Sequence, residues 1–91
     1  MVENLPARFS QWLGILQGLS GASQLKLSKA IGISQGQVSR LLAAREGGVG
    51  ADVSLSSLET VADHLALRPW QLVRYVELGE VPEELVKTVR A

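Results

Sequence analysis

Hydrophobic residues recur along this chain at the three- and four-residue spacing of amphipathic helices, and its glycines and prolines fall where helices would end or begin. The first helix is predicted to begin after Asn4 as its N-cap, with Pro6 in its first turn, and to end between Gly18 and Gly21. Its apolar face is expected to form part of the core. The residues on that face are Leu5, Phe9, Trp12, Leu13 and Leu16.

Two short helices are predicted next, separated by a three-residue turn. The earlier one covers residues 24–31 after Ser23 as N-cap, and Gly32 takes the left-handed conformation that ends a helix tightly. Ser34 is the expected N-cap of the later one, which covers residues 35–44. This third helix has an apolar face made of Val38, Leu41 and Leu42.

The second half of the chain predicts three more helices after an irregular glycine-rich loop over residues 45–55. A capping box of Ser56 and Glu59 is expected to start the fourth helix, and Pro69 and Pro82 open a fifth and a short sixth. The sequence therefore predicts an all-α fold of five to six helices. In the fourth helix the apolar stripe is Leu58, Val61, Ala62 and Leu65, whereas Glu59, Asp63 and His64 point elsewhere.

Composition narrows the classes of function. A chain of 91 residues suits one domain, and the absence of cysteine excludes disulfides, thiolate zinc sites and thiol nucleophiles. His64 is the sole histidine, and no pair of carboxylates is placed for acid and base roles, so we expect no enzyme, no metal site and no cofactor. Neither a signal peptide nor a membrane span is apparent, which favours the cytoplasm.

The net charge of zero hides an asymmetry between the two halves of the chain. Residues 1–50 carry five basic and two acidic side chains, whereas residues 51–91 carry four basic and seven acidic ones. A basic face opposite an acidic one would orient a protein on phosphate. Ordinary drift of charge along a small protein is the alternative explanation.

Residues 24–41 carry the pattern of a helix-turn-helix motif, which needs a small residue at the helix crossing, a turn glycine four positions later and apolar residues that lock the second helix. Together with the later helices, the run LKLSKAIGISQGQVSRLL…LSSLETVADHLALRPWQLV resembles the phage-repressor and Cro-like family, also called XRE or lambda-repressor-like. The resemblance spans roughly residues 9–78. It departs from the family in having Ser28 where alanine is usual and a longer loop at residues 45–55. The motif residues are Ser28, Gly32, Ile33, Val38 and Leu41.

The resemblance implies a lambda-repressor-like domain over residues 1–80 whose third helix enters the major groove of double-stranded DNA. A glutamine amide pairs with adenine and an arginine with guanine, so Gln35 and Arg40 are the strongest candidates for reading bases. The alternative interpretation is that these residues form only a polar, exposed helix start. The candidate base contacts are Ser34, Gln35, Gly36, Gln37, Ser39 and Arg40.

Four further residues are candidates for contacting phosphate: Gln24, Lys26, Lys29 and Arg45. By resemblance, Gln24 at the start of the second helix would donate to a backbone phosphate and fix the register of the reading helix. The three basic residues would add charge there, or they are ordinary solvated side chains.

The family resemblance also implies a homodimer, because one motif contacts only a few base pairs. Residues 81–91 are a candidate dimerisation element, with completion of the core as the alternative role for the apolar residues around them. Trp12 and Trp70 are expected to be packing anchors. The function predicted is a transcriptional repressor that binds an operator; the alternative is an antitoxin or adaptor that binds a protein partner and has weak DNA affinity. The apolar residues that would either form the dimer contact or complete the core are Tyr75, Val76, Leu78, Val81, Leu85, Val86 and Val89.

Overall fold

The computed structural model describes residues 5–45 and 54–91, and these form six α-helices and no strand, which confirms the predicted all-α fold. The predicted cap Asn4 and residues 46–53 of the predicted loop lie outside the described residues. The helices are α1 (Leu5–Ser20), α2 (Gln24–Ile31), α3 (Gln35–Arg45), α4 (Leu55–His64), α5 (Pro69–Leu78) and α6 (Glu83–Arg90).

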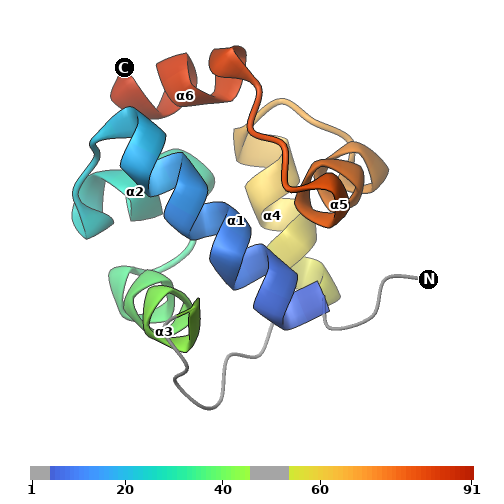
Figure 1. Cartoon of the computed structure of the whole chain (residues 1–91), viewed down its shortest axis with the longest axis horizontal. Coiled ribbons are helices and arrows are strands. Elements are labelled where there is room, and N and C mark those ends of the chain that lie inside the picture. The colour runs from blue at the N-terminus through green and yellow to red at the C-terminus, as the bar shows by residue number, and fades with distance from the viewer. Residues whose placement is uncertain (1–4, 46–53) are drawn as a thin grey trace.

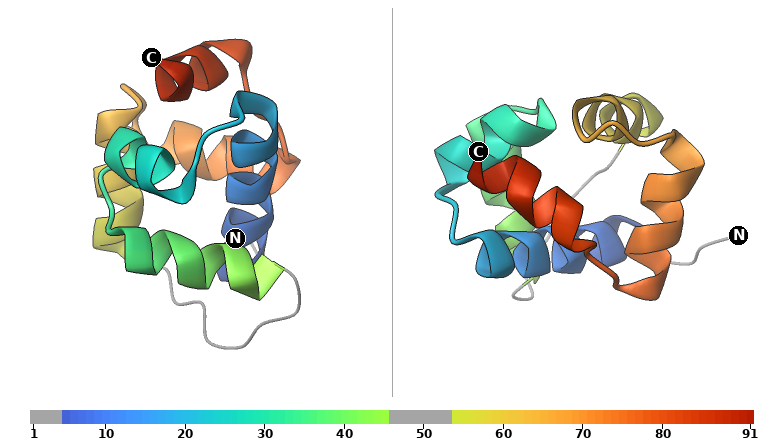
Figure 2. Two further views of the ribbon diagram at one scale, coloured as in Figure 1. Left: turned by 90° about the vertical axis from the view of Figure 1, so that its left-hand side faces the viewer. Right: turned by 90° about the horizontal axis from the view of Figure 1, so that it is seen from above.

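α1 crosses the molecule and separates two groups of helices (Figure 1). α2 and α3 lie on one side of it and α5 on the other, while α4 lies behind α1. α1 contacts α3, α5 and α6; α2 contacts α3, α4 and α6. Figure 2 shows α6 and α3 at opposite ends of the molecule. The motif formed by α2 and α3 is thus held by α1, α4 and α6, and it lies away from α5.

The core is built on the predicted apolar face of α1. Phe9, Trp12, Leu13 and Leu16 are all at most 1% exposed. The rings of Phe9 and Trp12 stack with centroids 6.1 Å apart and an interplanar angle of 15°. Trp12 also donates from Nε1 to the carbonyl oxygen of Glu80 at 2.7 Å, so its one polar atom is satisfied in the interior. Trp12 is therefore the packing anchor that the sequence predicted.

Trp70 is not a packing anchor, and that prediction is wrong. Its side chain is 64% exposed. α5 buries Leu72 and Val76, and Trp70 stands two positions before Leu72, about 200° around the helix. The phase of α5 therefore places the tryptophan on the outward face, although tryptophan is usually a core residue.

The start of α4 also differs from the prediction. The N-cap is Ser54, whose hydroxyl accepts from the backbone N–H of Ser57 at 3.1 Å, so α4 begins before Ser56 and the predicted capping box with Glu59 does not form. The earlier start brings Ser57 to the third position of the helix, where its hydroxyl accepts from the side chain of Gln37 at 3.2 Å. Several serines here could each cap a helix, and the start that the structure shows is accompanied by this contact between α4 and α3.

Most of the apolar residues near the C-terminal end complete the core. Leu85, Val86 and Val89 of α6 and Val76 of α5 are at most 8% exposed, and Tyr75 and Val81 are half-buried. Of that predicted set, Leu78 alone is an exposed residue, at 54%. The apolar face of α6 is therefore occupied within this chain, against α1 and α2.

At the C-terminal ends of three helices, a basic side chain from a different helix binds the backbone carbonyl oxygens. The last turn of α1 holds no basic residue, and Arg90 donates instead to the carbonyl oxygens of Leu19 at 3.0 Å and Ser20 at 3.4 Å. Lys26 donates to the carbonyl oxygen of Arg90 at 2.6 Å, and Arg8 donates to that of Glu77 at 3.1 Å. A positive charge at a helix C-terminus stabilises it through the helix dipole and by satisfying free carbonyls.

Arg90→Ala is expected to lower the free energy of unfolding by about 1 kcal/mol, because it removes a cation from the end of α1 together with its hydrogen bonds. Lys87→Ala is the matched control: Lys87 is also exposed on α6, and its ammonium lies 3.9 Å from Glu83 in a surface pair worth about 0.3 kcal/mol. Urea unfolding followed by circular dichroism measures both. Equal losses in the two variants would contradict the capping role of Arg90.

Candidate nucleic-acid interface

The two helices of the motif have the caps that the sequence predicted. The hydroxyl of Ser23 accepts from the backbone N–H of Lys26 at 3.1 Å, and that of Ser34 accepts from the N–H of Gln37 at 3.1 Å. Gly32 has a φ of 78°, in the left-handed region, and its N–H donates to the carbonyl oxygen of Ser28 at 2.9 Å. α2 therefore ends at Gly32, and α3 starts after a short turn.

The crossing of α2 and α3 is tightly packed. Ser28 is 6% exposed, and its hydroxyl donates to the carbonyl oxygen of Leu25 at 2.8 Å, so the serine leaves no buried polar atom unsatisfied. Val38 and Leu41 of α3 are at most 1% exposed. Serine thus fills the place where the family usually has alanine, and α3 is held by its buried face.

The turn glycine is constrained by a neighbour as well as by its backbone. A Cβ at Gly32 would overlap the imidazole ring of His64 on α4. Nδ1 of His64 lies 2.9 Å from the carbonyl oxygen of Thr60, which can only accept, so this nitrogen carries the proton. His64 is exposed, as predicted, and its ring also covers the turn.

α3 presents one continuous outward face made of Gln35, Gly36, Ser39 and Arg40, which are all exposed. Gln35 and Ser39 are four residues apart, as are Gly36 and Arg40, so the four positions share one face, opposite the buried Val38. A Cβ at Gly36 would meet no atom within 4 Å, so no described residue requires a glycine there. Within the described part of the chain Arg40 forms no ion pair.

The two remaining candidates for base contact have partners within the protein. Gln37 is half-buried and donates from Nε2 to the hydroxyl of Ser57 on α4 at 3.2 Å. Ser34 is exposed, but its hydroxyl caps α3. Both side chains therefore help to fix α3 in place, whereas the other four candidates share the outward face.

The candidate phosphate contacts do not gather in one place. Gln24 opens α2 and is half-buried. Lys26 and Lys29 lie on the outward face of α2, opposite the buried Leu27, and Lys26 bonds to the end of α6. Arg45 is the last residue of α3, and its side chain lies outside the described residues.

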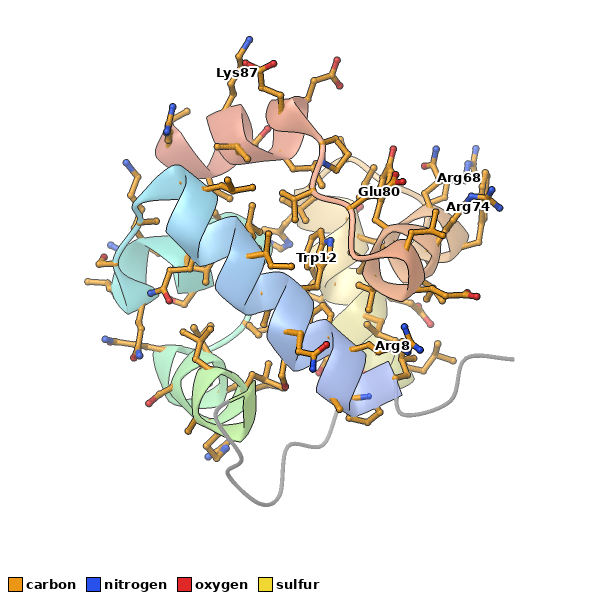
Figure 3. All side chains as sticks on the ribbon, in the orientation of Figure 1. Arg8, Trp12, Arg68, Arg74, Glu80 and Lys87 are labelled. Carbon is orange, nitrogen blue, oxygen red and sulfur yellow. The ribbon has the colours of Figure 1, made fainter. Side chains whose placement is uncertain are left out.

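Two arginines that the sequence analysis did not single out point outward together. Arg68 is the N-cap of α5, and Arg74 lies on the outward face of that helix. Both side chains extend from the edge of the molecule away from α3 (Figure 3). They lie in the half of the chain whose net charge is negative, so the charge count gave no sign of a basic cluster there. The basic and acidic halves of the sequence therefore do not correspond to two faces.

The described residues offer little for other chemistry. No group of three or more His, Asp or Glu side chains among them is placed to hold a metal ion. No helix in the described ranges is long and apolar enough to cross a membrane.

Gly32→Ala is expected to lower the free energy of unfolding by more than the roughly 1–2 kcal/mol that the left-handed conformation costs an alanine, because the new methyl group also displaces His64. The double variant Gly32→Ala/His64→Ala should recover the steric part of the loss, and urea unfolding measures both. In the control, Gly18→Ala in α1, the new Cβ meets nothing within 4 Å and stability should rise by about 1 kcal/mol. A Gly32→Ala variant as stable as the wild type would contradict this account.

Comparison with known proteins agrees with this geometry. Neither the curated proteins nor the solved structures include a match to this chain. The family model of the Cro/C1-type HTH DNA-binding domain matches residues 16–77, which include the last turn of α1, all of α2, α3 and α4, and nearly all of α5. This match covers more than half of the chain, and such domains are typically not enzymes. The chain therefore belongs to the Cro/C1-type helix-turn-helix family, which supports a DNA-binding regulator.

Proposed function

We propose that this protein is a sequence-specific regulator of transcription that binds double-stranded DNA as a dimer, with α3 in the major groove, and represses by occupying an operator. The observation that carries the proposal is the outward face of α3. Gln35, Ser39 and Arg40 are exposed there on a helix whose opposite face is fully buried. Side chains on a rigidly held helix reach base edges without a large loss of conformational freedom.

The chemistry of these side chains suits direct readout. The guanidinium of Arg40 matches the two acceptors of guanine, the amide of Gln35 matches adenine, and the hydroxyl of Ser39 bonds to either base or phosphate. Gly36 between them removes a side chain and so permits close approach of the α3 backbone to DNA. The bond from Gln37 to Ser57 supports the same role, because it fixes the rotation of α3 relative to α4.

Gln24 and Lys29 are proposed to hold the protein on the phosphate backbone. Gln24 is the first residue of α2, where the free N–H groups of the helix also favour an anion. Lys29 is exposed, whereas Lys26 already binds the end of α6 and is the weaker candidate. A dimer would place two such motifs on half-sites about 34 Å apart. The protein would then act inside the cell, with the cytoplasm as its proposed location.

Arg40→Ala is expected to weaken binding to the preferred duplex by about 5- to 150-fold and to relax the preference at one base pair, because a bidentate arginine–guanine pair contributes about 1–3 kcal/mol of discrimination. The preferred duplex is first selected from a random-sequence library with the wild-type protein, and affinities are then measured by fluorescence anisotropy at two salt concentrations.

Lys87→Ala is the matched control, since it removes one positive charge from α6, at the end of the molecule remote from α3. It should keep the base preference and nearly all of the affinity. Selection of no consensus by the wild type, or equal losses in both variants at every sequence, would contradict a reading role for α3.

The second candidate function is an antitoxin or adaptor whose main ligand is a protein. Zero net charge and the exposed Trp70 on α5, away from α3, favour it. It predicts weak DNA binding with no consensus, so the same selection experiment distinguishes it from the regulator.

A further inference from the structure

A pocket lies where α6 packs against α1, at the end of the molecule opposite α3 (Figures 1 and 2). Its volume is about 310 Å³, at the lower end of the range of about 300–1,000 Å³ that is usual for pockets that bind small ligands. Leu19 of α1 is 51% exposed beside it, and Val81, between α5 and α6, is half-buried. The pocket thus has apolar walls that the fold leaves partly uncovered. The residues that line it are Leu19, Val81, Glu83, Val86 and Arg90.

The wall that α6 contributes carries opposite charges at its two ends. Val86 lies three residues after Glu83 and four residues before Arg90, so the three residues share one face of the helix. Glu83 and Arg90 are seven residues apart, which corresponds to about 10 Å of helix rise. This wall is therefore acidic at one end, apolar in the middle and basic at the other end.

The guanidinium of Arg90 is fixed in position and still has donors available. Nη2 donates to the carbonyl oxygen of Leu19 at 3.0 Å, and Nε donates to that of Ser20 at 3.4 Å. Nη1 bonds to no described residue, and its N–H groups suit the oxygens of a carboxylate. Because the bonds to α1 already restrict this side chain, a ligand would lose little binding free energy in ordering it.

The carboxylate of Glu83 is also available to a ligand. Its Oε1 lies 3.9 Å from Nζ of Lys87, and both side chains are exposed. An exposed ion pair at such a distance contributes little to stability. Glu83 can therefore accept hydrogen bonds from a ligand's ammonium group without the loss of a strong bond within the protein.

We propose that this pocket binds a short apolar peptide of about three residues whose two ends are free. Arg90 binds the carboxylate of the peptide, Glu83 binds its ammonium group, and its side chains contact the apolar walls. Three extended residues span about 10 Å, which matches the separation of Glu83 and Arg90 along α6. The pocket is too small for a longer chain, and its opposite charges disfavour a polyanion. This site goes beyond DNA binding and does not depend on it.

A peptide in this pocket would contact the part of α6 that also holds the helix-turn-helix motif. The carbonyl oxygen of Arg90 accepts from Nζ of Lys26 on α2 at 2.6 Å, while the guanidinium of Arg90 binds the end of α1. The peptide would therefore strengthen a junction of α1, α2 and α6. Because it binds only the folded chain, it should also raise the unfolding temperature.

Titration of the full chain with trivaline, followed by nuclear magnetic resonance, tests the site, because this method measures weak affinities. Saturable shifts are expected for the backbone N–H signals of Leu19, Val81 and Val86. The indole N–H of Trp12 should shift too, since it donates to Glu80, the residue before Val81. Triglycine carries the same charges without the apolar side chains and should bind about tenfold more weakly or less.

Changes at the ends of the peptide, combined with variants of the protein, give the sharper test. Trivaline amide lacks the carboxylate and N-acetyltrivaline lacks the ammonium group, and each should bind the wild type about fivefold more weakly than trivaline. On Arg90→Ala, trivaline and its amide should bind equally well. On Glu83→Gln, trivaline and N-acetyltrivaline should bind equally well. Each comparison uses two peptides on one variant, so a change in the stability of that variant does not affect the result.

Leu19→Ala should weaken trivaline binding, because it shortens an apolar wall of the pocket. Leu25→Ala is the matched control: Leu25 is 47% exposed on α2 and does not line the pocket, so this variant should bind trivaline as the wild type does. The proposal would be overturned if the wild type does not bind trivaline, or if it binds the amide and the acetylated peptide as tightly as trivaline. Equal weakening by Leu19→Ala and Leu25→Ala would overturn the position of the site.

Discussion

Burial of one face of α1 is the constraint on which the rest of the structure depends. Trp12 lies fully inside and bonds to a carbonyl beyond the end of α5, while the same helix supports α3 on its other side. The orientation of α3 is thus set by side chains that precede the motif in sequence. A change in the volume of this face would tilt α3 and α5 together, because close-packed interiors transmit strain rather than absorb it.

Hydrogen bonds at the C-terminal ends of helices also hold the structure together. Arg8, Lys26 and Arg90 each bind carbonyls at the end of another helix, across sequence separations of more than sixty residues. These bonds tie the first and last helices of the chain to one another and to α2. Arg8 and Lys26 are two of the five basic residues in the first half of the sequence, so the charge count of that half overstates what is available for phosphate.

Local signals in the sequence were sufficient for α2, α3 and α5, because Ser23, Gly32 and Pro69 each have a single role at a helix boundary. The start of α4 was not predictable, since Ser54 and Ser56 are equally good caps and only a contact from Gln37 accompanies the choice. Trp70 was expected to be buried because of its residue type, but it is exposed because of its position around the α5 helix. On α3 the four exposed residues of the outward face were among the six candidates, but the bond that holds Gln37 depends on tertiary structure.

Few of the basic side chains that the structure describes on α2 and α3 are free to neutralise phosphate, and this bears on how the protein would behave inside a cell. Among the described residues of α2 and α3, Lys29 and Arg40 are basic without a bond to another helix. Sequence-independent affinity for a duplex grows with the number of phosphates neutralised, so a protein that acts as proposed with these two cations would be held only weakly by non-specific sites in a genome. Bulk chromosomal DNA would then sequester few copies, and a cell would need only a small pool of the protein to keep its true site occupied.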